Sequence, residues 1–135
     1  MRLKILILAG YIALLLAVTL VVYRGSPYAP IELDPIASYR RAANAPAPLA
    51  RIEIRNAVLN VLMFIPMGFL PPLVWRVMAK PYILIPAALA LTLTIETAQL
   101  LTNRGVFAIE DILHNVIGAA IGLLGYKIWI SITSK

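Results

Sequence analysis

Long apolar runs alternate with short polar stretches along this chain. Four runs stand out, at residues 5–23, 57–75, 82–101 and 109–132, the last with a polar beginning. At about 1.5 Å per residue, each is long enough to cross the roughly 30 Å hydrocarbon core of a bilayer as an α-helix. The pattern therefore predicts an all-α integral membrane protein, a single membrane domain of four transmembrane helices.

The connections between these helices differ in length. Residues 76–80 join the second helix to the third and residues 102–108 join the third to the fourth, so these helices should be antiparallel neighbours. Proline at high density disfavours a long helix, so the segment 24–55 is expected to form an irregular loop, with room for a short interfacial element around 36–43. Its prolines are Pro27, Pro30, Pro35, Pro46 and Pro48.

The basic residues suggest an orientation in the membrane. Four spans place both termini on one side, and the lysines and arginines divide evenly between the two sides. Arg2 and Lys4 before the first helix, with the compact basic turn 76–80, favour cytoplasmic termini under the positive-inside rule. The first run is too long for a signal-peptide core and has no small-x-small cleavage site, so we interpret it as an uncleaved helix. Loop 24–55 is then extracytoplasmic.

The amino-acid composition limits the classes of molecule that the protein is expected to bind. Hydrophobic residues make up 61% of the chain and charged residues only 13%, against about 25% charged in soluble domains. The net charge of +6 is carried beside the spans, where anionic lipid headgroups are nearer partners than nucleic acid. The chain has no cysteine, which excludes disulfides and thiol chemistry. Membrane lipids are the expected partners, no nucleic-acid binding is expected, and the oligomeric state stays open.

Polar residues recur at the start of the second helix, the end of the third and the start of the fourth. Connectivity puts these three ends on the same side of the membrane, so the polar residues should share one depth. Ionisable groups inside a span are costly and usually mark a functional site. The candidate ligand-binding residues are Asn60, Glu96, Gln99, Arg104, Asp111, His114 and Asn115, flanked by Asn56 and Glu110.

Several readings of this polar layer remain open. Arg104, in the turn before the fourth helix, is placed to neutralise Glu96 or Asp111. Alternatively the layer only holds helices together, and for His114 a packing role is favoured over a proton shuttle or metal ligand. No ligand spacing such as HExxH is present, and the serines lie outside the layer, so we assign no catalytic residue, metal or cofactor.

Small residues and prolines in the spans are read mainly as structural. Gly118 and Gly122 form a GxxxG pair that suits close helix packing. Gly68 and the prolines of the second helix suit a kink, and a cleft beside Pro66 is a further possibility.

Ordered motifs carry a family resemblance. Residues 60–68 (NVLMFIPMG) resemble the NxxxFxPxG segment of the VanZ-like family. Residues 96–99 (ETAQ), then Arg104, then residues 111–122 (DILHNVIGAAIG) are similar to that family's ExxQ, R and DxxxNxxGxxxG series. The family commonly has another acidic residue three positions before the final Asp. Here that position is Ala108, and the spacing is one residue longer.

The resemblance implies a bacterial cytoplasmic (inner) membrane protein. The family is named for low-level resistance to the glycopeptide teicoplanin and has no established enzymatic reaction. The leading hypothesis is a non-enzymatic envelope protein that binds an amphiphilic or anionic ligand, such as a lipid-linked cell-wall intermediate or a lipoglycopeptide, in an outer-leaflet polar cleft. Arg40, Arg41, Arg51 and Arg55 would attract its phosphates. The alternatives are a membrane enzyme acting on a lipid-linked substrate and a structural accessory subunit.

Overall fold

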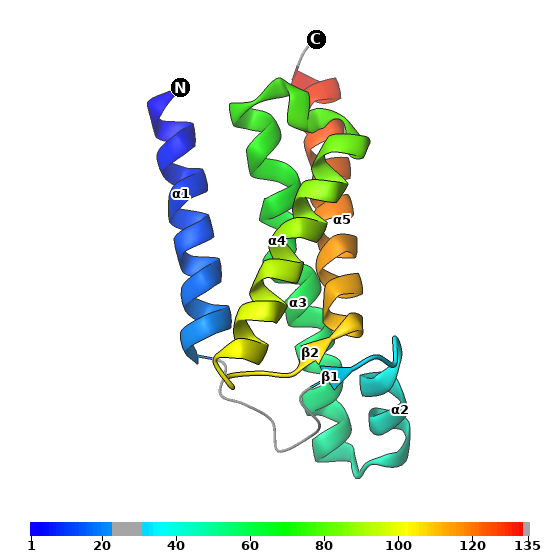
Figure 1. Cartoon of the computed structure of the whole chain (residues 1–135). Helices are drawn as coiled ribbons and strands as arrows, with labels where there is room; N and C mark the ends of the chain where they lie inside the picture. The colour runs from blue at the N-terminus through cyan, green and yellow to red at the C-terminus, as the bar shows by residue number, and fades with distance from the viewer. Residues whose placement is uncertain (23–30, 134–135) are drawn as a thin grey trace.

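The computed structural model describes residues 1–22 and 31–133, and this part of the chain contains four long, apolar helices running side by side (Figure 1). The first turn of α1 and the last turn of α5 lie at the same end of the bundle. Each helix is long enough to cross a bilayer, which confirms an all-α membrane protein with four transmembrane helices. The helices are α1 (Arg2–Ala17), α3 (Ala47–Val74), α4 (Pro81–Leu101) and α5 (Ile109–Thr133).

Helices α3 and α5 cross with their backbones almost in contact. A Cβ added at Gly118 would collide with the carbonyl oxygen of Val61, and one added at Gly122 with that of Ile65. Gly68 faces the same crossing, because a Cβ there would meet the backbone of α5. Only hydrogen atoms on these Cα positions leave room for such an approach. The GxxxG prediction is therefore confirmed, and Gly68 contributes to the same close packing, the explanation favoured for it from the sequence.

Helix α3 begins ten residues earlier than the sequence pattern predicts, at Ala47 instead of Ala57. Pro46 stands just before the helix and Pro48 occupies its first turn, where the missing N–H group costs nothing. The prediction from proline density that residues 47–55 belong to an irregular loop was therefore wrong. At 28 residues, α3 is roughly 42 Å long, so its first turns extend beyond the hydrocarbon core.

Shorter elements gather around that protruding end of α3 (Figure 1). Helix α2 (Ala37–Asn44) matches the interfacial element expected around 36–43. Strands β1 (Ile31–Glu32) and β2 (Phe107–Ala108) pair in parallel, which ties the segment after the first helix to the turn before α5. The remaining turn, between α3 and α4, is the 3₁₀ helix η2 (Arg76–Ala79) at the opposite end.

Helix α1 continues as a single π-helical turn, η1 (Val18–Val22), and Tyr23, predicted as its last residue, lies outside the described residues. The end of α4 supplies side-chain donors to η1. Gln99 Nε2 donates to the Thr19 carbonyl at 2.9 Å, and Arg104 Nη1 donates to the Leu20 carbonyl at 3.0 Å. Carbonyl groups at a helix end need such partners. The two bonds hold α1 beside α4.

The C-terminus of α4 ends in a Schellman turn that aims Arg104 at α1. Asn103 has a φ of 52°, a left-handed conformation that asparagine tolerates better than most residues. The Arg104 amide donates to the Gln99 carbonyl at 2.9 Å, and the Asn103 amide donates to the Leu100 carbonyl at 3.2 Å. The polar end of α4 is thereby fixed against both α1 and the turn into α5.

Candidate functional site

A small cavity of about 50 Å³ lies where α1, α3, α4 and α5 meet, near the protruding end of α3. We call it the inner cavity. It brings together most of the candidate residues chosen from the sequence, because connectivity places the start of α3, the end of α4 and the start of α5 at one depth. Its polar lining consists of Thr19, Asn60, Glu96, Gln99, Asp111 and Asn115, and its apolar lining of Val18, Met63 and Ile95.

Hydrogen bonds fix the side chains of the inner cavity. Glu96 is buried, and its Oε2 accepts the Ala108 amide at 3.0 Å. Asn115 is also buried and donates from Nδ2 to Thr92 Oγ1 at 2.7 Å. Asn60 and Asp111 line the cavity from α3 and α5. The hydrogen bonds fix the orientation of the Glu96 and Asn115 side chains.

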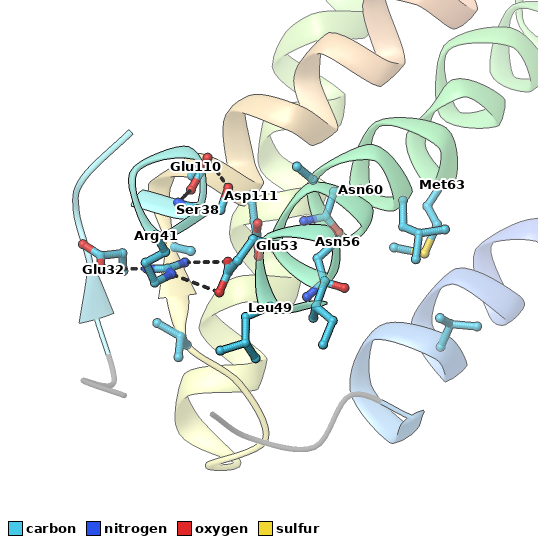
Figure 2. Close-up of a pocket in the computed structure, with 16 residues that line it drawn as sticks. Glu32, Ser38, Arg41, Leu49, Glu53, Asn56, Asn60, Met63, Glu110 and Asp111 are labelled. Carbon is cyan, nitrogen blue, oxygen red and sulfur yellow. Dashed lines mark hydrogen bonds and ion pairs between the residues drawn. The ribbon is translucent and has the colours of Figure 1, made fainter. Parts of the chain in front are cut away.

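A larger cleft of about 500 Å³ adjoins the inner cavity. The two share Val18, Asn60, Met63 and Asp111 in their linings. We call the larger space the outer cleft. Apolar side chains and polar or charged residues from α2, α3, β1 and α5 line it together (Figure 2). Pro66 lines neither space. The cleft therefore lies nearer the start of α3 than the cleft that the sequence suggested beside Pro66. Its larger apolar lining residues are Leu49, Ile52, Leu59, Met63, Val18 and Val106.

Arg41 of α2 stands among carboxylates at the mouth of the outer cleft (Figure 2). Its guanidinium lies 3.5 Å from Glu32 and 3.2 Å from Glu53. Burial lowers the pKa of Arg41, but the hydrogen bond to Glu53 and the negative charges of Glu53, Glu32 and Glu110 outweigh that effect and raise the pKa above its usual value. Arg41 is thus engaged by the protein's own carboxylates.

Helix α2 is docked on α5 by two residues one turn apart. The buried carboxylate of Glu110 accepts the Ser38 amide at 2.7 Å and the Ser38 hydroxyl at 2.6 Å. Ser38 lies in the first turn of α2, so Glu110 also faces the positive end of the helix dipole. The next turn places His114 Nε2 at 2.9 Å from the Tyr39 hydroxyl, with the two rings edge to face. These contacts hold one wall of the cleft in place.

Two candidate residues fall outside the inner cavity. Arg104 is exposed and donates to the Leu20 carbonyl; among the described residues it forms no ion pair with Glu96 or Asp111. The expected neutralisation is therefore wrong, because the Schellman turn directs Arg104 toward α1. His114 is buried against Tyr39 and lines neither space, in keeping with the packing role favoured for it.

Several cleft residues were missed in the sequence. Glu32, Ser38 and Glu53 belonged to a segment predicted to be an irregular loop, where no periodicity pointed to them. Glu53 lies seven residues before Asn60, which is two helical turns, so the two share a face of α3. A predicted second helix that began at Ala47 would have identified Glu53 from this spacing. Nothing in the sequence signals the contact between Ser38 and Glu110.

The charges at this end of the bundle differ from those expected. Arg40 pairs with Asp34 at 2.8 Å and Arg41 pairs with Glu32 and Glu53, so two arginines expected to attract phosphate are already neutralised. Within residues 1–22 and 31–133, no group of three or more His, Asp or Glu side chains is arranged to hold a metal ion. The site is a polar and acidic pocket that also has apolar lining residues. Its chemistry suits recognition of a headgroup.

Comparison with known proteins places the chain in a family. No curated protein and no solved structure matches it. A family model described as VanZ/LLP1 does match, in agreement with the motifs at residues 60–68, 96–99 and 111–122. Because that match extends over residues 5–130, nearly the whole chain, the protein belongs to the VanZ/LLP1 family.

Proposed function

We propose that this protein binds an amphiphilic ligand of the bacterial cell envelope, with its headgroup in the inner cavity and an apolar chain in the outer cleft. The observation that carries the proposal is the joining of the two spaces through Val18, Asn60, Met63 and Asp111. The joined spaces combine apolar and polar lining residues, and ligand pockets bury apolar surface and use a few placed polar groups for specificity.

The position of the site in the bundle supports a lipid-borne ligand. The polar residues lie at the end where α3 extends past the hydrocarbon core, so a headgroup would sit at interfacial depth. The apolar side chains of the cleft follow α3 inward from Leu49 to Met63. Leu49 and Ile52 lie in the protruding turns, whereas Leu59 and Met63 lie deeper, so a chain lying against Leu59 and Met63 would be at the depth of the hydrocarbon.

The proposed orientation places this end toward the outer leaflet of the cytoplasmic membrane. Arg2, Lys4, Arg76 and Lys80 lie at the opposite end, where the positive-inside rule puts the cytoplasm. The cysteine-free chain allows a direct test by single replacements. Arg51→Cys should react with an impermeant maleimide added to intact cells, and Val77→Cys should react only after permeabilisation. The reverse pattern would invert the orientation.

A large side chain placed in the outer cleft should prevent the ligand from binding. Asn56 lines the outer cleft, whereas Val58 is half exposed and lines neither space. We expect Asn56→Trp to lower the amount of lipid that co-purifies with the detergent-extracted protein by about tenfold, because an indole would occupy the cleft. Val58→Trp adds the same side chain and should retain lipid at the wild-type level. Mass spectrometry of the intact protein measures the retained lipid, and equal retention in both variants would overturn the proposal.

The family name motivates a physiological extension of the proposal. If the ligand is a lipid-linked cell-wall intermediate or a lipoglycopeptide, expression should give low-level protection against teicoplanin. The same two variants test it: protection should disappear with Asn56→Trp and persist with Val58→Trp. Protection that is absent from the wild type would remove the extension and leave amphiphile binding to be judged by lipid retention.

Enzymatic turnover is the second candidate, because Glu96 and Asp111 face one cavity and paired carboxylates can exchange protons with a substrate. Purified protein would then change the mass of the retained lipid with time, and Asp111→Asn would stop the change. A constant lipid mass would leave binding as the function.

A further inference from the structure

The inner cavity is lined by several hydrogen-bond acceptors, and two side-chain amides of its lining already donate within the protein. Gln99 Nε2 donates to the Thr19 carbonyl, and Asn115 Nδ2 donates to Thr92 Oγ1. In contrast, Asn115 Oδ1 is buried and has no hydrogen-bond partner among the described residues. Asn115 lines the inner cavity, and buried polar atoms normally have partners, so this unpaired acceptor indicates a missing donor.

Carboxylates surround that unpaired acceptor. Glu96 and Asp111 line the same cavity as Asn115, and Glu96 is only 3% exposed. Carboxylate oxygens accept hydrogen bonds, and a carboxylate removed from water is stabilised by a cation. A ligand group that enters should therefore carry several N–H or O–H donors and a positive charge.

The charged residues that line the outer cleft, which adjoins the inner cavity, are also mostly acidic. Glu32, Glu53, Glu110 and Asp111 line the outer cleft, and Arg41 is its sole basic lining residue within the described chain. A cleft lined by one sign of charge concentrates the opposite ion. These carboxylates would repel an anionic headgroup. From the sequence, the arginines were expected to attract the phosphate of such a headgroup.

Size and lining distinguish between kinds of cation. The inner cavity holds about 50 Å³, enough for a few water-sized groups. Quaternary ammonium groups are bulky, donate no hydrogen bonds and are usually held by aromatic rings. Within residues 1–22 and 31–133, none of the residues lining this cavity is aromatic. A primary ammonium is compact and has three donors.

We propose that the inner cavity recognises a primary ammonium group, and that the amphiphile bound by this protein carries an amine-bearing headgroup. The ammonium donates to Asn115 Oδ1 and to the carboxylates of Glu96 and Asp111, while the chains lie along the outer cleft. The inference rests on the proposed amphiphile binding and adds the class of headgroup. An aminophospholipid and an amine on a soluble molecule share this chemistry.

A methylation series tests the inference. Full-length protein in detergent is titrated with phosphatidylethanolamine, its N-methyl and N,N-dimethyl forms, phosphatidylcholine and phosphatidylglycerol, all with the same acyl chains. Binding should weaken at each methylation and be about tenfold weaker or more for phosphatidylcholine, because each step removes a charge-assisted donor. Phosphatidylglycerol should bind no better than phosphatidylcholine.

Matched variants assign the selectivity to the cavity. Glu96→Gln and Asp111→Asn keep the side-chain shape and should flatten the series. Asp34→Asn makes the same chemical change outside both spaces and should leave the series unchanged. Thermal unfolding shows whether each variant is folded, and selectivity that survives in both folded cavity variants would overturn the assignment.

The outcomes separate this inference from the function on which it depends. Equal binding of all five lipids, with loss in Asn56→Trp, would overturn amine recognition and leave amphiphile binding standing. Equal lipid binding by Asn56→Trp and wild type would overturn amphiphile binding itself. Chain-free glycerophosphoethanolamine distinguishes the sources: displacement of the lipid supports recognition of the amine alone, and failure to displace a selectively bound lipid supports an aminophospholipid.

Discussion

Replacing Gly122 with leucine should abolish the folded protein. A Cβ at this position would collide with the Ile65 carbonyl and come within 2.9 Å of the Gly68 Cα, and both are backbone atoms that cannot rotate away. Helices α3 and α5 would have to separate along their whole crossing. We expect a loss of about 3 kcal/mol or more in the free energy of unfolding, since overpacking against backbone exceeds the usual cost of an enlarged side chain.

Gly10 provides the matched control for this prediction. It lies in α1, and a Cβ there would meet nothing within 4 Å. Gly10→Leu should therefore fold and unfold like the wild type, while Gly122→Leu should yield little monodisperse protein in detergent and a lowered thermal midpoint. Gly118→Leu should behave like Gly122→Leu, because its Cβ would meet the Val61 carbonyl. A stable, wild-type-like Gly122→Leu would contradict the close crossing of α3 and α5.

Removing the Glu110 carboxylate should release α2 from the bundle. Glu110→Ala deprives the Ser38 amide and hydroxyl of their acceptor, and both are buried. Two hydrogen bonds to a charged group are worth about 3 kcal/mol or more together. We expect the amides of Ala37–Asn44 to exchange with deuterium roughly a hundredfold faster, while those of α4 and α5 keep their protection.

An exposed hydrogen bond of the same helix gives the control. Asn44 donates from Nδ2 to the Arg40 carbonyl at 2.8 Å, but this pair is exposed to solvent. Asn44→Ala should change the exchange of α2 by less than about threefold, because water replaces the lost donor. Unchanged protection of α2 in Glu110→Ala would show that Tyr39 and His114 suffice to dock it. The release of α2 should also weaken lipid binding, since Ser38 and Arg41 line the outer cleft.

The convergence of the polar residues was predictable from connectivity. Short turns on either side of α4 require the start of α3, the end of α4 and the start of α5 to share one side, so Asn60, Glu96 and Asp111 had to lie at similar depth. Hydrophobic run length likewise predicted the four spans. Both predictions depend on local patterns that a membrane enforces, because every apolar run must be about as long as the bilayer is thick.

The walls of the outer cleft were not predictable in the same way. Proline density concealed the first turns of α3, although proline is compatible with a helix start. The contacts of Ser38 with Glu110 and of Tyr39 with His114 join residues more than seventy positions apart, and no periodicity reports such pairs. Strands β1 and β2 have two residues each, too few for an alternating pattern.

The direction of individual side chains also required the structure. Arg104 was expected to face the carboxylates because it follows Glu96 closely in the sequence. The left-handed Asn103 turns the chain so that Arg104 reaches Leu20 instead. Glu96 and Arg104 therefore do not form an ion pair that a double charge reversal could restore. Such a double variant cannot test whether the two residues have a structural role. The acidic character of the site follows from this detail, because no arginine of the described residues lines the inner cavity.

The central claim, that a headgroup occupies the inner cavity, is tested most directly by photo-labelling. A phosphatidylethanolamine analogue with a diazirine in the acyl chain next to the headgroup is bound to the purified protein, irradiated and located by peptide mass spectrometry. Labels should fall on residues 56–63 of α3 and around Val18 of η1, and excess phosphatidylethanolamine should remove them. Labelling confined to the lipid-facing residues Ile117, Ile121 and Leu124 of α5, and insensitive to competitor, would contradict the claim.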